Sequence, residues 1–362
     1  MRPRFARFGP ILLLGFLATS QPLAAQLPTP EQLQMLLQRF PEADANHDGV
    51  LSVDEALAYA AKVRGSRPTN TRGSVAPAPT LADVAYGPHE RNVLDFWQAP
   101  AATSANPTPV VVYIHGGGFI TGDKSRVRRD AIVLQCLDAG VSFAAINYRY
   151  LATTTSLPDL LRDCGRAVQF LRSHAGDWHI DKARVASFGE SGGAGASLWL
   201  AFHADLADPK NSDPILREST RLACVGATSP QFSYDIARWF DEFGKNLMLR
   251  LAGSYTTQLL YGLDEETALE SEAGKKIRAD CDMLRLATKE ASPVFLGVTL
   301  PAGDIANTNQ LLHHPRHAQL LYDRCRELGI PVVANIPAFD IAPPKDGPAT
   351  LREFLMKNLK VK

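Results

Sequence analysis

The sequence predicts an α/β fold, in which helices cover both faces of a mostly parallel β-sheet and a small helical module precedes it. From about residue 81, short apolar and β-branched runs alternate with helical patterns, which is typical of parallel sheets buried on both faces. Residues 65–80 are rich in Gly, Pro, Ser and Thr, as expected of a linker between domains. A length of 362 residues, 45% of them hydrophobic, suits one large and one small domain.

The first 25 residues have the pattern of a secretory signal peptide. Three arginines (Arg2, Arg4 and Arg7) precede the apolar run 11–18, and small residues follow. We expect cleavage after Ala25, with the site after Ser20 as the alternative. The apolar run is too short to span a bilayer. We therefore expect an exported protein, periplasmic or secreted, without a membrane span.

Residues 26–64 predict a helix–loop–helix of the EF-hand type, with Ca²⁺ as its cofactor. The loop 44–55 has an oxygen-bearing side chain at each position where the motif needs one, and Gly49 stands at the sharp turn. A single EF-hand would pair in a dimer, dock on the large domain or act as a structural clip, and we expect a structural or tethering role. The expected ligands are Asp44, Asn46, Asp48, the Val50 carbonyl, Ser52 and Glu55.

The large domain is expected to cover residues 81–362. The stretch 229–291 is too long for a simple crossover and predicts a lid or cap. The expected strands are 92–97, 109–114, 141–147, 184–188, 222–227, 293–298 and 330–335. The expected helices are 130–137, 157–174, 192–203, 317–328 and 350–359.

Composition narrows the classes of function. The 38 basic and 38 acidic residues balance, so no electrostatic argument favours nucleic acid as a partner. The five cysteines have no metal-binding spacing, and their odd number leaves at least one thiol free. Several lie within apolar runs, which favours buried small side chains.

Residues 189–193, Gly-Glu-Ser-Gly-Gly, follow an apolar strand and precede a helix. This is the pattern of a nucleophile elbow, a sharp turn that exposes the hydroxyl of Ser191 and needs small neighbours. A serine hydroxyl is a weak nucleophile and requires a base. The N–H of Gly192 would point at a developing oxyanion.

Residues 115–118, His-Gly-Gly-Gly, follow a second buried strand. The N–H groups of Gly116 and Gly117 would be the other oxyanion donors. His115 precedes the serine and would compete with the oxyanion if it were the base, so we interpret it as a residue that shapes the loop.

On these motifs the chain resembles the α/β-hydrolase superfamily, and more closely its hormone-sensitive-lipase-like and bacterial feruloyl or acetylxylan esterase group. The resemblance covers about residues 81–335 and also includes the stretches 86–88, 92–95, 147–150 and 163–168. It implies hydrolysis of small-molecule or carbohydrate esters without a catalytic cofactor. It assigns Ser191 as the nucleophile and Gly116, Gly117 and Gly192 as oxyanion donors.

The family places a histidine after the eighth strand, yet this sequence has none beyond His317. The loop after the seventh strand contains Asp304, where the family places its acid, followed by His313 and His314. Either histidine would serve as a base of unusual origin, or the cluster would only cap the next helix. Both interpretations remain open, and Asp340 is a second candidate acid.

The sequence therefore predicts an exported, calcium-binding serine esterase with Ser191 as nucleophile and His313 or His314 as base. The alternative is a non-catalytic protein that binds a ligand in the hydrolase pocket, which the displaced histidine would explain.

Overall fold

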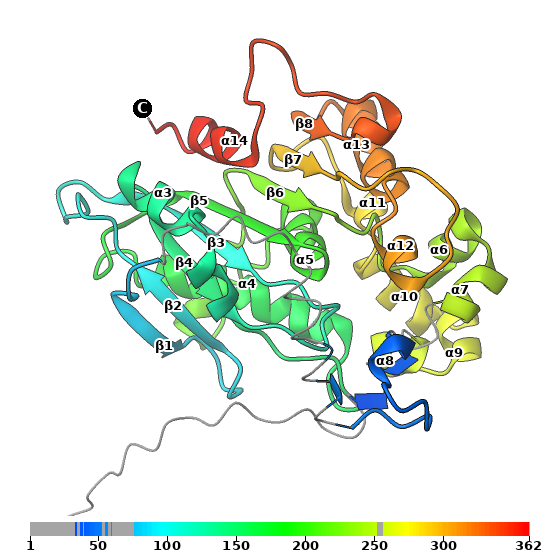
Figure 1. The fold of residues 1–362 in the computed structure, drawn as a ribbon. Coiled ribbons are helices and arrows are strands. Elements are labelled where there is room, and N and C mark those ends of the chain that lie inside the picture. The colour runs from blue at the N-terminus through cyan, green and yellow to red at the C-terminus, as the bar shows by residue number, and fades with distance from the viewer. Residues whose placement is uncertain are drawn as a thin grey trace, which may run out of the picture.

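The computed structural model describes residues 33–34, 37–38, 40–52, 55–56, 59, 76–251 and 256–361. An eight-stranded sheet with the order β1-β2-β4-β3-β5-β6-β7-β8 forms its centre (Figure 1). The pairs β1–β2 and β2–β4 are antiparallel, and all the other pairs are parallel. The predicted α/β fold is confirmed. The strands are β1 (Leu81–Ala85), β2 (Val93–Trp97), β3 (Thr108–Ile114), β4 (Ser142–Ile146), β5 (Ile180–Glu190), β6 (Val225–Thr228), β7 (Val294–Gly297) and β8 (Val332–Asn335).

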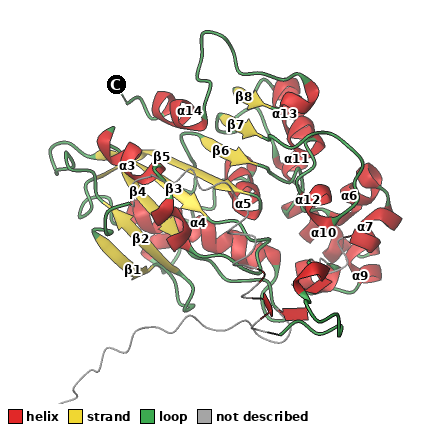
Figure 2. Ribbon diagram, viewed as in Figure 1, coloured by secondary structure: helices red, strands yellow, loops and turns green. Residues whose placement is uncertain are grey.

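Helices cover both faces of the sheet (Figure 2). Alternate residues of a strand point to opposite faces, so Val110 and Val112 of β3 enter one apolar cluster and Val111 enters the other. The first cluster includes α4 (Leu157–Ser173), α5 (Gly192–Phe202) and α13 (Arg316–Leu328), and the second includes α3 (Ile132–Asp138) and α14 (Leu351–Asn358). Short 3₁₀ turns are η1 (Pro41–Ala43), η2 (Lys124–Arg129), η3 (Pro214–Arg217) and η4 (Pro337–Phe339).

A chain of short helices connects β6 to β7, within the stretch expected to form a cap. Several of them face the end of the sheet at which Ser191 lies, and together we call them the cap helices. They are α6 (Ile236–Phe243), α7 (Lys245–Leu251), α8 (Thr257–Tyr261), α9 (Glu265–Glu270), α10 (Glu272–Asp280) and α11 (Met283–Leu286). One further helix, α12 (Thr308–Leu312), follows β7.

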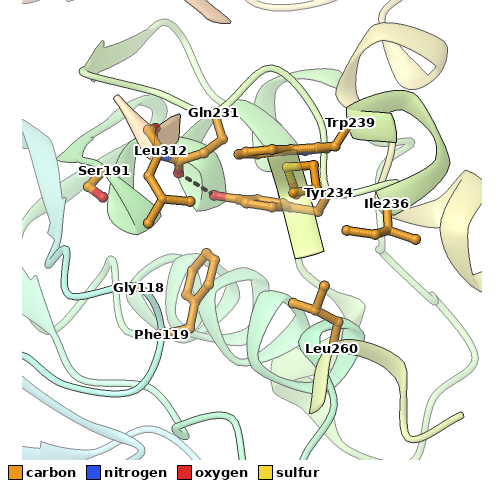
Figure 3. Close-up of a pocket in the computed structure, with 11 residues that line it drawn as sticks. Gly118, Phe119, Ser191, Gln231, Tyr234, Ile236, Trp239, Leu260 and Leu312 are labelled. Carbon is orange, nitrogen blue, oxygen red and sulfur yellow. Dashed lines mark hydrogen bonds between the residues drawn. The ribbon is translucent and has the colours of Figure 1, made fainter. Parts of the chain in front are cut away.

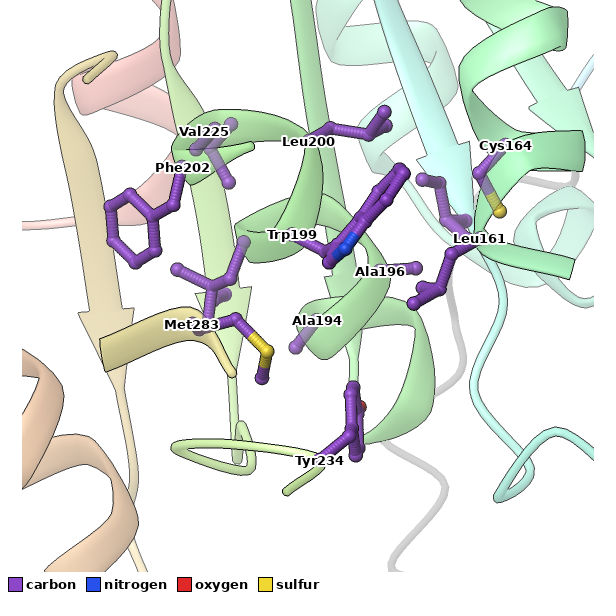
Figure 4. Packing of buried hydrophobic residues seen from close by; sticks show 14 of the residues in the cluster. Leu161, Cys164, Ala194, Ala196, Trp199, Leu200, Phe202, Val225, Tyr234 and Met283 are labelled. Carbon is purple, nitrogen blue, oxygen red and sulfur yellow. The ribbon is translucent and has the colours of Figure 1, made fainter. Parts of the chain in front are cut away.

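Helix α5 is buried along its whole length. Trp199 projects toward Leu161 and Cys164 of α4 (Figure 4), and its indole N–H donates to the Asp280 carbonyl at 2.7 Å. A helix that is buried on every side and mostly apolar is held by close packing. The N-terminus of α5, where the candidate nucleophile stands, is therefore set rigidly against the sheet.

Residues 76–80 belong to the large domain and not to the linker. Ala76 is buried and donates its N–H to the Arg128 carbonyl at 3.0 Å, and the Trp97 indole N–H donates to the Pro77 carbonyl at 2.8 Å. Their Pro-Ala-Pro-Thr composition suggested a linker, but these contacts attach them to the sheet. Strand β5 is also longer than expected, since charged residues at its start interrupt the apolar pattern without ending the strand.

The expected signal peptide (1–25), residues 65–75 of the expected linker and most of the helices expected to flank the EF-hand loop lie outside the described residues. Within the part that is described, no helix combines the length and the apolar character needed to cross a membrane. All five cysteines are buried and carry free thiols, which confirms their expected burial.

Candidate active site

The turn between β5 and α5 holds Ser191 in an unusual backbone conformation, with φ 55° and ψ −122°. A serine adopts such angles only where the surroundings impose them. The close packing of the neighbouring glycines imposes these backbone angles on Ser191. A Cβ on Gly189 would lie 2.4 Å from the Gly193 carbonyl carbon, and a Cβ on Gly193 would lie 2.0 Å from the Ile114 oxygen. The predicted elbow geometry is present, and its small residues are required by contact.

The glycine loop after β3 lies directly against this elbow. Gly117 has φ +125°, and a Cβ on Gly116 would lie 2.5 Å from the Glu190 oxygen. Within the described chain, the N–H groups of Gly116, Gly117 and Gly192 donate to no other backbone group. Gly118, which the sequence analysis does not assign, lines the pocket beside Ser191 and Gly192.

His115 is fully buried and shapes this loop, as expected. Its ring stacks on Tyr148 with centroids 4.3 Å apart, and its Nδ1 lies 2.9 Å from the Gly116 oxygen. Burial lowers the pKa of His115 to about 3, so the ring stays neutral.

His313 faces Ser191. Its Nε2 lies 2.8 Å from Ser191 Oγ, a hydrogen-bonding distance. His313 directly follows α12, so the histidine comes from the loop after β7 and not from the loop after β8. Of the two histidines left open by the sequence, the structure brings only His313 into contact with the serine.

Asn309 lies on the other side of the His313 ring. The Nδ1 atom of His313 is 2.9 Å from Asn309 Oδ1 and 3.1 Å from the Asn309 backbone oxygen. Asn309 is not predicted from the sequence, because an acidic residue is expected beside the histidine. The signal available was the spacing of four residues along a helix, which places two side chains on one face.

The other predicted members of the site lie elsewhere. His314 Nδ1 accepts the Arg316 N–H at 3.2 Å, so this ring caps the start of α13, and burial lowers its pKa. Asp304 is exposed and makes no hydrogen bond or ion pair within the described residues. Asp340 is also exposed, in the turn after η4. His317 is buried against Phe232 and other rings, and burial lowers its pKa to about 3.

An apolar pocket opens beside Ser191 and contains about 520 Å³ of unfilled space, part of it open to solvent. Figure 3 shows Ser191 at one end, with Phe119 and Leu260 opposite the rings of Tyr234 and Trp239. Its one amide side chain, Gln231, already donates to the Leu312 carbonyl at 2.7 Å and accepts from the Tyr234 hydroxyl at 3.2 Å. The lining residues from the cap helices are Ile236, Trp239, Met248 and Leu260.

The loop 44–52 together with Glu55 is stabilised by its own polar groups. Asp44 is buried; its Oδ2 accepts the Gly49 N–H at 2.9 Å, while its Oδ1 has no hydrogen-bond partner. The Glu55 carboxylate accepts from the Ser52 hydroxyl at 2.7 Å, which lowers the Glu55 pKa. No three His, Cys, Asp or Glu side chains within the described chain are gathered as a metal cluster. The unpartnered Asp44 oxygen nevertheless fits a cation ligand at the first position of the loop.

Comparison with known proteins finds a family model and several relatives that resemble this chain. The family model BD-FAE matches residues 94–242. A probable carboxylic ester hydrolase, LipM, of Mycobacterium tuberculosis is 30% identical over 44% of this chain and 36% of its own length. A probable isoprenylcysteine alpha-carbonyl methylesterase, ICMEL2, of Arabidopsis thaliana is 28% identical over 44% of this chain and 37% of its own length. The alignments thus span little more than a third of these curated relatives.

Two solved structures share the fold at low identity. An acetyl ester-xyloside bifunctional hydrolase from Caldicellulosiruptor lactoaceticus has a TM-score of 0.51 and 18% identity, covering 72% of this chain and 86% of the other. A truncated carbohydrate esterase from gut microbiota has a TM-score of 0.55 and 14% identity, covering 78% of this chain and 100% of the other. The sheet order, the serine elbow and these structures together show that the chain has the α/β-hydrolase fold.

Proposed function

We propose that this protein hydrolyses carboxylic esters, with Ser191 as nucleophile and His313 as general base. The observation that carries the proposal is the 2.8 Å contact between Ser191 Oγ and His313 Nε2, on a serine held in a strained elbow. The esterase names of the curated relatives support it.

In the proposed reaction, Ser191 Oγ attacks the ester carbonyl carbon and His313 Nε2 takes the hydroxyl proton. The carbonyl oxygen becomes an oxyanion next to the N–H groups of the glycine loop and of Gly192, in the positive field of the α5 N-terminus. His313 then gives the proton to the leaving alcohol. Water repeats the sequence on the acyl-enzyme and releases the acid.

The pocket favours esters that carry a bulky hydrocarbon group. Its side chains are almost all apolar, and the polar groups of Gln231 and Tyr234 bond to each other and to the backbone. A sugar ring in this space would lose its hydration without gaining partners, which is costly. We therefore favour a carboxylesterase over a sugar-acyl esterase, with any sugar outside the pocket.

Labelling with a fluorophosphonate tests the proposal, because Ser191 Oγ displaces fluoride from phosphorus only if a base activates it. We expect labelling of the wild type and none of Ser191→Ala or His313→Ala, whereas His314→Ala serves as the matched control and labels normally. The absence of labelling in a folded wild type would instead support the non-catalytic, ligand-binding alternative.

We also propose that the loop 44–55 binds Ca²⁺ in a structural role, through the six ligands expected from the sequence. The buried, unpartnered Oδ1 of Asp44 supports it. Calorimetry with CaCl₂ on the full chain should show one site that Glu55→Gln weakens at least tenfold and Glu90→Gln, at an exposed acid outside the loop, leaves intact. The absence of heat at millimolar calcium would contradict the proposal.

Export remains a proposal that rests on residues 1–25. Mass spectrometry of the mature N-terminus from a native host would test it. A chain starting near residue 26 outside the cytoplasm is expected, and a cytoplasmic chain that retains Met1 would contradict it.

A further inference from the structure

We propose that Asn309 is the positioning residue for His313, a neutral amide where a carboxylate would be expected. The inference rests on the proposed function, since it assigns a role within the same reaction. Asn309 lies one helical turn before His313, at the start of α12, and presents two oxygens to the same ring nitrogen, at 2.9 and 3.1 Å. A ring held at two points has little freedom to turn away from Ser191.

These contacts determine which nitrogen carries the proton. The Asn309 backbone carbonyl only accepts hydrogen bonds. The His313 Nδ1 must therefore be protonated and donate, and the Asn309 amide turns its oxygen toward the ring for the same reason. The lone pair of His313 Nε2 then faces Ser191 Oγ. This is the tautomer that a general base needs.

The neutrality of Asn309 has a chemical consequence. When His313 accepts the serine proton it becomes a cation, and an amide dipole stabilises that cation less than a carboxylate charge does. Asn309 therefore orients the His313 ring without adding a charge beside it.

Two substitutions at this exposed position test the inference with little risk to folding. Asn309→Asp adds the missing charge and should raise the midpoint of the acidic limb of kcat/KM by about one pH unit. Asn309→Ala removes one of the two acceptors and should lower kcat roughly 10-fold with KM unchanged, because the backbone carbonyl still holds the ring.

Gln310→Glu is the matched control. It adds the same charge one residue further along α12, and the new carboxylate still accepts the Ala306 N–H that Gln310 accepts at 2.8 Å. We expect it to change neither kcat nor the pH midpoint, since its side chain bonds to Ala306 and not to His313. An equal shift in Gln310→Glu and Asn309→Asp would show only a general field effect and would overturn the inference.

A readout independent of turnover separates this inference from the proposed function. In ¹⁵N-histidine-labelled protein, His313 should appear as the Nδ1–H tautomer, and Asn309→Asp should raise its titration midpoint by about one unit. An Nε2–H tautomer, or a midpoint that Asn309→Asp leaves unmoved, would overturn the role of Asn309. A wild type without Ser191-dependent hydrolysis would refute the proposed function, even where the tautomer is as expected.

Discussion

The contact between the elbow and the glycine loop makes Gly193→Ala a severe test of the active-site geometry. A methyl group at this position would lie 2.0 Å from the Ile114 oxygen, whereas ordinary contact begins at 3.4 Å, so β3 and α5 must separate by 3.4 − 2.0 = 1.4 Å. Ile114 immediately precedes the glycine loop, and Ser191 lies two residues before Gly193. The separation therefore moves the oxyanion donors away from the nucleophile.

A displacement of about 1 Å at a reacting centre costs roughly 100-fold in rate, and the loss of one oxyanion donor costs roughly 100- to 1,000-fold. We expect kcat/KM of Gly193→Ala to fall in that range, together with a loss of stability of about 1–3 kcal/mol from overpacking. The assay is hydrolysis of a p-nitrophenyl ester alongside thermal unfolding. Gly176→Ala is the control, because a Cβ at Gly176 meets nothing within 4 Å. A Gly193→Ala enzyme within threefold of the wild-type rate would refute the reasoning.

Three further predictions follow from the site and the sheet. His313→Ala should lower kcat about 10⁴-fold, as the loss of a catalytic base does, whereas His314→Ala stays within a few fold; equal rates in the two variants would contradict the assignment. Met248→Ala enlarges the pocket and should shift the acyl-chain preference, measured with a series of p-nitrophenyl esters, toward longer chains. Met248→Trp should shift the same preference toward acetate. If neither variant changes the acyl-chain preference, tests with acetates of bulky alcohols would show whether the pocket holds the alcohol instead. Burial opposes ionisation of Asp95, but hydrogen bonds from Lys124 and Arg128 outweigh the effect of burial and hold the pKa of Asp95 below its ordinary value. The charged form of Asp95 therefore stabilises the fold above about pH 4, and this stabilisation is lost as the pH falls through the lowered pKa. Asp95→Asn should cost about 3 kcal/mol or more at pH 7 and weaken the acid dependence seen in urea unfolding, and parallel curves for variant and wild type would contradict this.

Most of the fold follows from patterns that the chain carries locally. The buried strands are continuous apolar runs and the covering helices have strong periodicity, so sequence alone places them within a few residues. The elbow and the glycine loop are equally predictable, since each is a short stretch whose backbone only glycine permits at several positions. The contact of residues 76–80 with the large domain is not predictable from the sequence, because it depends on Arg128 and Trp97, which are distant in sequence.

The placement of His313, His314 and Asn309 around Ser191 depends on tertiary structure. The sequence narrows the base to His313 or His314, but only the end of α12 decides which ring turns to Ser191 and which caps α13. An acidic residue is expected beside the histidine, which points to Asp304, whereas the residue in that place is Asn309. A neutral residue is not recognisable by charge, and its role appears only when its oxygen is seen against the imidazole.

The short helix α12, which ends just before His313, is hydrogen-bonded to the segment between β6 and β7. The Thr308 hydroxyl donates to the Leu251 carbonyl of α7, and Gln231 bonds to the Leu312 carbonyl. Ser191 thus lies at the start of the buried helix α5, whereas His313 follows a helix that is hydrogen-bonded to α7. The distance between Ser191 Oγ and His313 Nε2 therefore depends on where the cap helices hold α12, so a substitution in the cap far from Ser191 can change this contact.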